Sequence, residues 1–208
     1  MTAAWALLGV AVGAGLGVWL RVRRYAPVEQ SALPWWTVVL SAGSLGVLVP
    51  ALWYRQETFA IFGVGMAFLV GGLVCFWTDL DVHRLPDWAT WPMFLSLVVL
   101  AGFEALSTGS WARFLEAVVT AAGCGLVFFV AAVLTSLGLG DVKLLLSIGF
   151  VLGFWGWPAL GIGLLLSCGV AVVWAVVLLL RGRAKTDHLP LGPALVLGTV
   201  LAILMRVA

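Results

Sequence analysis

Eight long apolar stretches, separated by short charged or Pro- and Gly-containing breaks, make up most of this chain. A helix needs roughly 20 predominantly apolar residues to cross a bilayer. Eight such spans use most of the 208 residues, so little chain is left for a folded unit outside the membrane. The composition agrees, because only 10% of the residues are charged, against about a quarter in soluble domains. A soluble protein is therefore excluded.

The expected fold is an all-α, polytopic membrane protein with about eight transmembrane helices in a single membrane-embedded domain over residues 1–208. One long apolar run is divided in two because Gly153, Gly156 and Pro158 interrupt it. The breaks place the spans near residues 3–20, 35–54, 58–77, 88–107, 114–137, 142–156, 159–180 and 190–207.

Basic residues predict the orientation, because cytoplasmic loops carry the excess of Lys and Arg. With eight spans, one side holds three basic residues and the other holds the remaining eight of eleven. We therefore expect the richer side to face the cytoplasm and both termini to lie outside it. The three are Arg55, Arg113 and Arg206; the eight are Arg21, Arg23, Arg24, Arg84, Lys143, Arg181, Arg183 and Lys185.

Several function classes are disfavoured by the same residues. The few scattered basic side chains cannot form a nucleic-acid surface, so the expected surroundings are membrane lipid. Cys75, Cys124 and Cys168 stand alone in apolar stretches and are expected to be packing residues, with no metal site indicated. The two histidines, His83 and His188, accompany no Gly-x-Ser-x-Gly turn, so no serine-hydrolase constellation competes.

Carboxylates are costly in a bilayer, so their positions carry most of the information. Asp79, Asp81 and Asp87 are expected in the connection after the third span, and Asp141 at the start of the sixth. Asp141 alone would be read as a helix N-cap, preceded by glycines that allow a sharp turn. Two acidic segments on one membrane face instead suggest a carboxylate pair for acid and base catalysis. The other five acids are expected to be solvated: Glu29, Glu57, Glu104, Glu116 and Asp187.

Three segments resemble one known family, the type IV prepilin peptidases, which are membrane aspartyl proteases of the GxGD type. Residues 138–143, GLGDVK, are similar to the family's Gly-x-Gly-Asp-x-Lys signature. Residues 79–87, DLDVHRLPD, resemble its other loop, in which Pro follows a catalytic Asp after seven residues. Residues 189–193, LPLGP, are similar to an Ile-Pro-Phe-Gly-Pro segment. The resemblance runs from about residue 60 to the C-terminus.

The resemblance implies that Asp79 and Asp141 are the catalytic pair, in catalytic loops 79–87 and 138–143. By its position in the sequence, Asp81 is an alternative to Asp79 for the catalytic role. It is expected instead to tune the electrostatics of the site or to bind a substrate amine. Lys143 either favours the ionised form of Asp141 or is an interfacial lysine. The remaining supporting residues are Asp87, expected to cap the fourth helix, Pro86, expected to fix the turn before it, and the glycines Gly138 and Gly140.

The resemblance also implies substrates: prepilins of type IV pili or pseudopilins of secretion systems, cut at the cytoplasmic boundary of the bacterial inner membrane. No metal or organic cofactor is expected. Bifunctional members carry a longer insert after the first span, with paired CxxC motifs, and methylate the new N-terminus. Here residues 21–34 contain no cysteine, so we expect peptidase activity without N-methyltransferase activity. The alternatives are a small cation-binding transporter or channel, or a non-catalytic pilus or secretion assembly protein.

Overall fold

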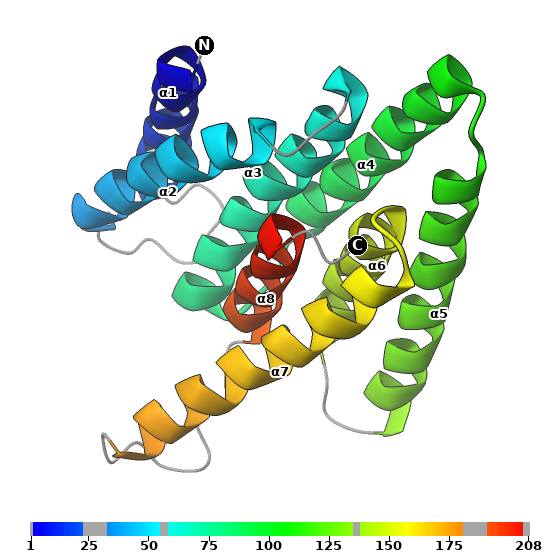
Figure 1. The fold of residues 1–208 in the computed structure, drawn as a ribbon. Coiled ribbons are helices and arrows are strands. Elements are labelled where there is room, and N and C mark those ends of the chain that lie inside the picture. Colours follow the sequence, from blue (N-terminus) through cyan, green and yellow to red (C-terminus); the bar gives the residue numbers. More distant parts are fainter. Residues whose placement is uncertain (1, 23–32, 55–57, 135–137, 181–190, 206–208) are drawn as a thin grey trace.

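The computed structural model describes residues 2–22, 33–54, 58–134, 138–180 and 191–205, and within them it contains helices and no strand. The eight helices predicted from hydropathy are confirmed (Figure 1). They are α1 (Thr2–Arg21), α2 (Trp36–Trp53), α3 (Phe59–Val82), α4 (Asp87–Thr108), α5 (Ala112–Leu134), α6 (Leu139–Phe154), α7 (Trp157–Leu180) and α8 (Leu191–Met205).

Some residues discussed above lie outside these described ranges. They are Arg23, Arg24, Glu29, Arg55, Glu57, Arg181, Arg183, Lys185, Asp187, His188, Leu189, Pro190 and Arg206.

Six helices, α1 to α5 and α7, are long and apolar enough to cross a membrane. The two others are shorter, with 16 residues in α6 and 15 in α8. At 1.5 Å per residue they measure about 24 and 22 Å, less than the roughly 30 Å of a hydrocarbon core. The chain is a polytopic membrane protein in which α6 and α8 are shorter than the six helices around them.

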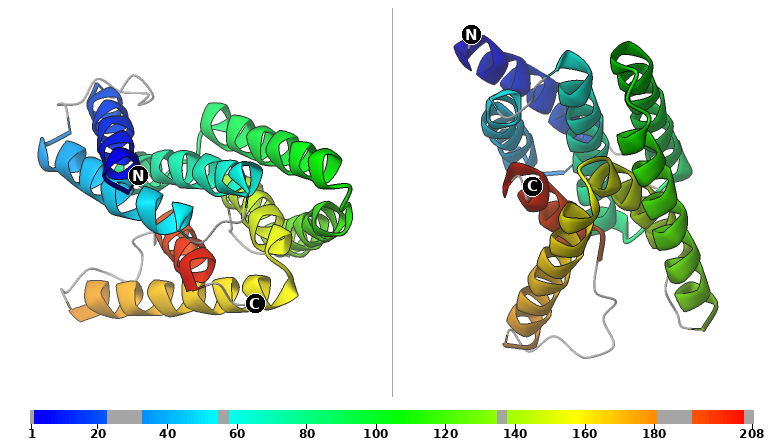
Figure 2. Two further views of the ribbon diagram at one scale, coloured as in Figure 1. Left: turned by 45° about the horizontal axis from the view of Figure 1, so that its top comes forward. Right: turned by 45° about the vertical axis from the view of Figure 1, so that its right-hand side comes forward.

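The short helices lie inside the bundle. In α6, ten residues from Leu144 to Phe154 are buried, and α6 packs against α3, α4, α5, α7 and α8. The helix α8 packs on α3, α6 and α7. Figures 1 and 2 show both near the centre, with α1 and α2 as a pair to one side. The core is therefore centred where α6 and α8 meet α3 and α4.

Two predicted boundaries are wrong in a way that bears on function. The third helix continues past residue 77 to Val82, and the sixth begins at Leu139 instead of residue 142. Polar residues at a helix end can reach the interface while their backbone stays hydrogen-bonded, so the apolar run ends before the helix does. Asp79 and Asp81 therefore lie in the last turn of α3, and Asp141 in the first turn of α6, not in loops.

Glycines of the first helix hold α1 against α2. A Cβ added to Gly9 would lie 2.3 Å from the Leu45 carbonyl oxygen, and one added to Gly13 would lie 2.2 Å from that of Ser41. Neither distance is sterically possible, so only glycine permits this approach. Small residues at every fourth position of a span allow two helices to pack closely, and Gly9 and Gly13 have that role here.

The cysteine prediction holds for two of three residues. Cys75 and Cys124 are buried, whereas Cys168 on α7 is exposed and packs in no core. Trp77, which hydropathy places at a span end, is buried and donates its Nε1–H to Ser41 Oγ at 2.9 Å. This tryptophan joins α3 to α2 and is not an interface anchor.

Candidate active site

Asp79 occupies the end of α3 and is almost fully buried, with 5% of its surface exposed. Its carboxylate oxygen Oδ2 accepts a hydrogen bond from the backbone N–H of Gly192 at 2.9 Å. Gly192 is the second residue of α8, and the first four N–H groups of a helix have no partner within it. The positive end of the α8 dipole also faces this oxygen. The N-terminus of α8 therefore holds the Asp79 side chain.

The end of α3 is set by His83, which follows the helix with φ of 50°. Its backbone N–H donates to the Asp79 carbonyl oxygen at 3.0 Å, as in left-handed helix C-caps. Histidine is less suited than glycine to this conformation. The turn closes α3 four residues after Asp79 and directs the chain toward α4.

Asp141 approaches from the first turn of α6 and is half-buried. It does not cap the helix, because Gly138 is the N-cap residue and accepts the Asp141 N–H at 3.0 Å. Asp141 precedes the apolar part of α6, outside the six long spans. Burial and the nearby Asp79 charge together raise the pKa of its carboxyl to about 6, although a hydrogen bond from the Gly138 backbone acts in the opposite direction.

Together, α3, α6 and α8 bring Asp79 and Asp141 close enough for the charge on one to affect the pKa of the other. The three helices pack on each other pairwise. Two interacting carboxyls favour a state with one shared proton. Such a pair can take a proton from water at one member and give a proton at the other.

Asp81 lies on a different side of α3 from Asp79. It lies two residues after Asp79 in the same helix, and positions i and i+2 point about 200° apart. Its side chain is half-buried. The continuation of α3 thus places Asp79 and Asp81 on different sides of one helix, and the choice of Asp79 as the catalytic residue stays a prediction.

The connection between α3 and α4 packs on the start of α6. A Cβ added to Gly140 would lie 3.0 Å from Leu85 Cβ and 3.4 Å from the Leu85 carbonyl oxygen. Gly138 has φ of −69° and Gly140 is helical, so neither forms the sharp turn expected of the glycine pair. Gly140 instead lets Leu85 approach α6. Pro86 behaves as predicted, in that it precedes α4 in an extended conformation.

Asp87 has a different role from the one expected, because it pairs with Lys143. The Asp87 carboxylate does not cap α4, whose N-cap is Pro86 without a side-chain hydrogen bond. Its Oδ1 accepts a hydrogen bond from Lys143 Nζ at 2.5 Å instead. The lysine ammonium is thereby directed to α4, and it is not among the causes that shift the pKa of Asp141. This partly exposed ion pair links the starts of α4 and α6.

The family model for the type IV leader peptidase family matches residues 64–180, which is more than half of the chain and includes both Asp79 and Asp141. The chain belongs to the type IV leader peptidase family. Two curated relatives, one from Aeromonas salmonicida strain A449 and one from Aeromonas salmonicida, are named prepilin leader peptidase/N-methyltransferase. Each is 34% identical over 137 residues, covering 61% of this chain and 43% of the relative. The chain thus spans less than half the length of these relatives. No solved structure matches.

The sequence of this leader peptidase family member did not predict the contact between Gly192 and Asp79. Gly192 lies beyond the matched residues 64–180, and the sequence offered it only as part of the LPLGP segment. A Cβ at this position would lie 2.8 Å from Asp79 Oδ2. The glycine in a Pro-x-Gly-Pro sequence at a span entrance is the signal that could have suggested a close approach.

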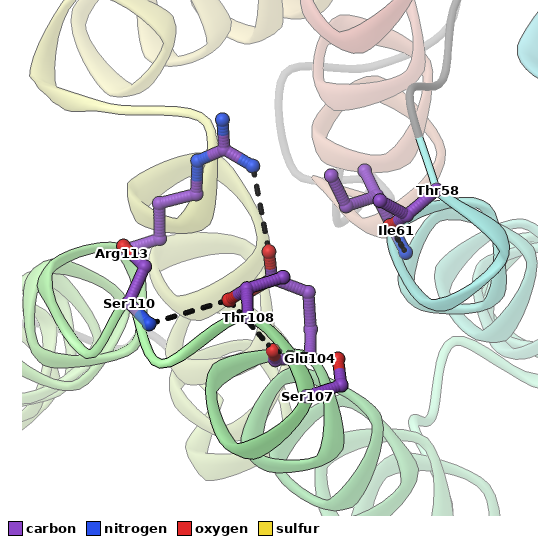
Figure 3. A network of polar contacts seen from close by, with 7 residues as sticks. All are labelled: Thr58, Ile61, Glu104, Ser107, Thr108, Ser110 and Arg113. Carbon is purple, nitrogen blue, oxygen red and sulfur yellow. Dashed lines mark hydrogen bonds and ion pairs between the residues drawn. The ribbon is translucent and has the colours of Figure 1, made fainter.

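A second buried acid lies far from the pair, at the other end of α4. Glu104, expected to be solvated, has only 2% of its side chain exposed. Its Oε1 lies 3.5 Å from Arg113 Nη1, and its Oε2 has no hydrogen-bond partner among the described residues. Figure 3 shows Glu104 reaching toward Arg113, with Thr108 beside it. Since 17 residues of helix separate it from Asp87, about 25 Å, it does not belong to the candidate site of this family member.

Within the described parts of the chain, no group of three or more His, Cys, Asp or Glu side chains is placed to hold a metal ion.

Proposed function

We propose that this chain is an aspartic endopeptidase that removes the short basic leader from type IV prepilins or pseudopilins at the cytoplasmic boundary of the bacterial inner membrane. The observation that carries the proposal is the approach of Asp79 and Asp141 from two helix ends within the residues matched by the family. The relatives' name supports the substrate class. We further propose that the eight helices act as one membrane-embedded peptidase domain.

In the proposed mechanism, Asp79 is the general base and Asp141 the general acid. This assignment follows from hydrogen bonding and from the pKa of one partner: Asp79 Oδ2 already acts as an acceptor for the Gly192 N–H at 2.9 Å, and the pKa of Asp141 is raised to about 6, so Asp141 is given the shared proton. Asp79 takes a proton from water as the water oxygen attacks the scissile carbonyl. Asp141 gives its proton to the carbonyl oxygen. The tetrahedral intermediate then collapses: the C–N bond breaks as the leaving nitrogen takes up the proton held by Asp79, and Asp141 takes a proton back from one of the two hydroxyls, which re-forms the carbonyl and restores the starting protonation of both residues.

We propose that water reaches this site from the end of the bundle where Asp141 lies. Asp141 is half-buried and Gly138 beside it is exposed, whereas Asp79 lies deeper. The ends of α3, α4, α6 and α8 that meet here are those expected on the Lys- and Arg-rich side of the membrane. That agreement supports an active site facing the cytoplasm, where the basic leader of a prepilin lies.

The proposal is tested by co-expressing the chain with a prepilin of its own host and following leader removal by gel mobility. Asp79→Asn and Asp141→Asn are expected to stop cleavage while the protein still inserts and folds. Asp81→Asn is the matched control, because it removes the same charge from the same helix turn on the opposite side. Cleavage by either of the first two variants would remove that residue from the mechanism.

The absence of a cysteine-containing segment in residues 21–34 supports a peptidase without N-methyltransferase activity. The purified protein is expected neither to bind S-adenosylmethionine nor to transfer its methyl group to a cleaved pilin. Methyl transfer by the purified protein, measured with labelled S-adenosylmethionine, would contradict this part of the proposal and leave the peptidase part intact.

A further inference from the structure

An apolar groove runs beside Asp79 between three helices. It has a volume of about 230 Å³ and is lined by residues of α2, α3 and α8, among them Leu48, Phe76 and Val196. The helix α3 packs on both α2 and α8, so it is the floor of the groove and they are its walls. Two lining residues, Leu40 and Leu197, are 55% and 40% exposed. The α2–α3–α8 groove is therefore open to the surface that faces lipid.

Among the described residues, the lining of the groove offers no free polar side chain to an occupant. Two of the described lining residues, Ser44 and Trp77, carry a polar side-chain atom. The Ser44 hydroxyl donates to the Ser41 carbonyl oxygen at 3.1 Å. The Nε1–H of Trp77 is already bonded to Ser41 Oγ. An occupant must therefore be apolar, because a polar one would lose hydrogen bonds with water and gain none here.

The groove continues to the candidate catalytic pair along two helices. Phe76 in the groove lies three residues before Asp79, on the same face of α3. Val196 lies four residues after Gly192, on the same face of α8, and Gly192 bonds Asp79. The lining of α3 begins at Leu69, ten residues from Asp79. The groove thus extends from about 5 to about 15 Å from the pair along α3.

We propose that the α2–α3–α8 groove binds the hydrophobic helix of the substrate, directly after the bond that is cut. This inference rests on the proposed prepilin peptidase function. The volume is below the roughly 300–1,000 Å³ of a drug-sized ligand pocket, so the groove takes one stripe of side chains, not a whole helix. The substrate helix runs parallel to α8 and antiparallel to α3. At 1.5 Å per residue, the stripe comes from about the third to the tenth residue after the cut.

A substrate helix fits these observations better than a lipid chain does. A continuous helix carries both the scissile bond and the apolar stripe, so one molecule accounts for the carboxylate pair and for the groove that ends beside it. A lipid acyl chain is apolar throughout, so it carries no group that would interact with Asp79 at the end of the groove nearest that residue. Lipid remains one of the outcomes that the experiment separates.

Photo-crosslinking tests the occupant directly. The full-length Asp141→Asn protein is co-expressed with an intact prepilin, and benzoylphenylalanine replaces Leu197 in the groove. The matched control replaces Leu95 of α4, which is 63% exposed and does not line the groove. We expect the Leu197 position to crosslink to the prepilin helix and the Leu95 position to crosslink to lipid alone. Crosslinks of Leu197 to lipid alone, with bound prepilin present, would overturn the proposal.

Filling the groove provides a second test in the active protein. Leu197→Trp is expected to raise KM for a full-length prepilin about tenfold, the effect of losing one well-buried apolar side chain from the contact, with kcat nearly unchanged. Leu95→Trp is expected to leave both constants unchanged. Failure of the parent protein to cut any host prepilin would refute the proposed function. Normal cleavage with unchanged KM in Leu197→Trp and no groove crosslink would refute the groove alone.

Discussion

Replacing Gly192 with alanine tests whether the N-terminus of α8 holds the carboxylate of Asp79. The added Cβ would lie 2.8 Å from Asp79 Oδ2 and 3.1 Å from both Cβ and Cγ of that residue. Carbon atoms in good contact are about 3.5–4.0 Å apart. The Asp79 side chain must therefore rotate away from α8, because the Cβ also presses on its inner atoms. Rotation breaks the 2.9 Å hydrogen bond from the Gly192 N–H.

The size of the effect follows from that lost bond. A hydrogen bond to a charged group contributes about 1.5–3 kcal/mol, which corresponds to a decrease of about 10- to 150-fold in kcat/KM. The helix itself is not expected to weaken, since alanine favours helix over glycine by about 1 kcal/mol. The loss should therefore fall on catalysis and not on the formation of α8.

Purified Gly192→Ala protein would be assayed on a full-length prepilin in detergent, with thermal unfolding measured in parallel. Gly161→Ala is the neutral control, because nothing lies within 4 Å of the added carbon. Gly198→Ala is the packing control, because its Cβ would lie 2.3 Å from the Ser167 backbone nitrogen, between α7 and α8 and away from Asp79. We expect Gly198→Ala to lower the unfolding temperature and Gly192→Ala to lower the rate.

A Gly192→Ala protein with the parent kcat/KM would refute the reasoning, because the Asp79 carboxylate would then need no contact with α8. Equal rate losses in Gly192→Ala and Gly198→Ala, each matched by a lower unfolding temperature, would also refute it. They would show that α8 supports the fold and does not position Asp79.

Three further predictions concern titration, an ion pair and helix packing. The kcat/KM of the parent protein is expected to fall as pH rises through about 6. Burial and Asp79 raise the pKa of Asp141 to about 6, and Asp141 must keep its proton to act as the acid. A kcat/KM that increases from pH 5 to 8 would reverse the assignment of Asp141 as acid and Asp79 as base. Lys143→Met is expected to change the unfolding free energy by about 1 kcal/mol or less, since its ion pair is partly exposed, and a larger loss in a denaturation series would contradict this. Gly13→Leu is expected to separate α1 from α2 and to cost about 1–3 kcal/mol, whereas Gly15→Leu, where nothing lies within 4 Å, should unfold like the parent protein.

Much of the fold could be predicted from local patterns alone. The eight helices follow from runs of apolar residues, because each helix satisfies its own backbone within the bilayer. The glycines of α1 also act as their spacing predicts, since every fourth residue falls on one face of a helix. The helix ends were less well predicted, because hydropathy reports where the apolar run stops and hydrogen bonding decides where the helix stops.

The candidate site was predictable only in part. Asp79 and Asp141 could be selected because acids are rare in apolar sequence and because their surroundings resemble known motifs. The burial of Glu104 was not predictable, because it depends on Arg113 and on the helices packed around the end of α4. The pairing of Lys143 with Asp87 was missed for a similar reason, since 56 residues separate the two partners.

By itself, the sequence determined that this chain forms apolar helices in a membrane and that a few aspartates lie at their ends. These are local properties, set by hydropathy and by the cost of charge in lipid. Only the tertiary structure decided that the charge of Asp79 acts on Asp141, that Gly192 supplies a hydrogen bond to Asp79, and that an apolar groove forms between α2, α3 and α8. Each of these depends on side chains from helices distant in the chain, whose rotation and contact are set by packing.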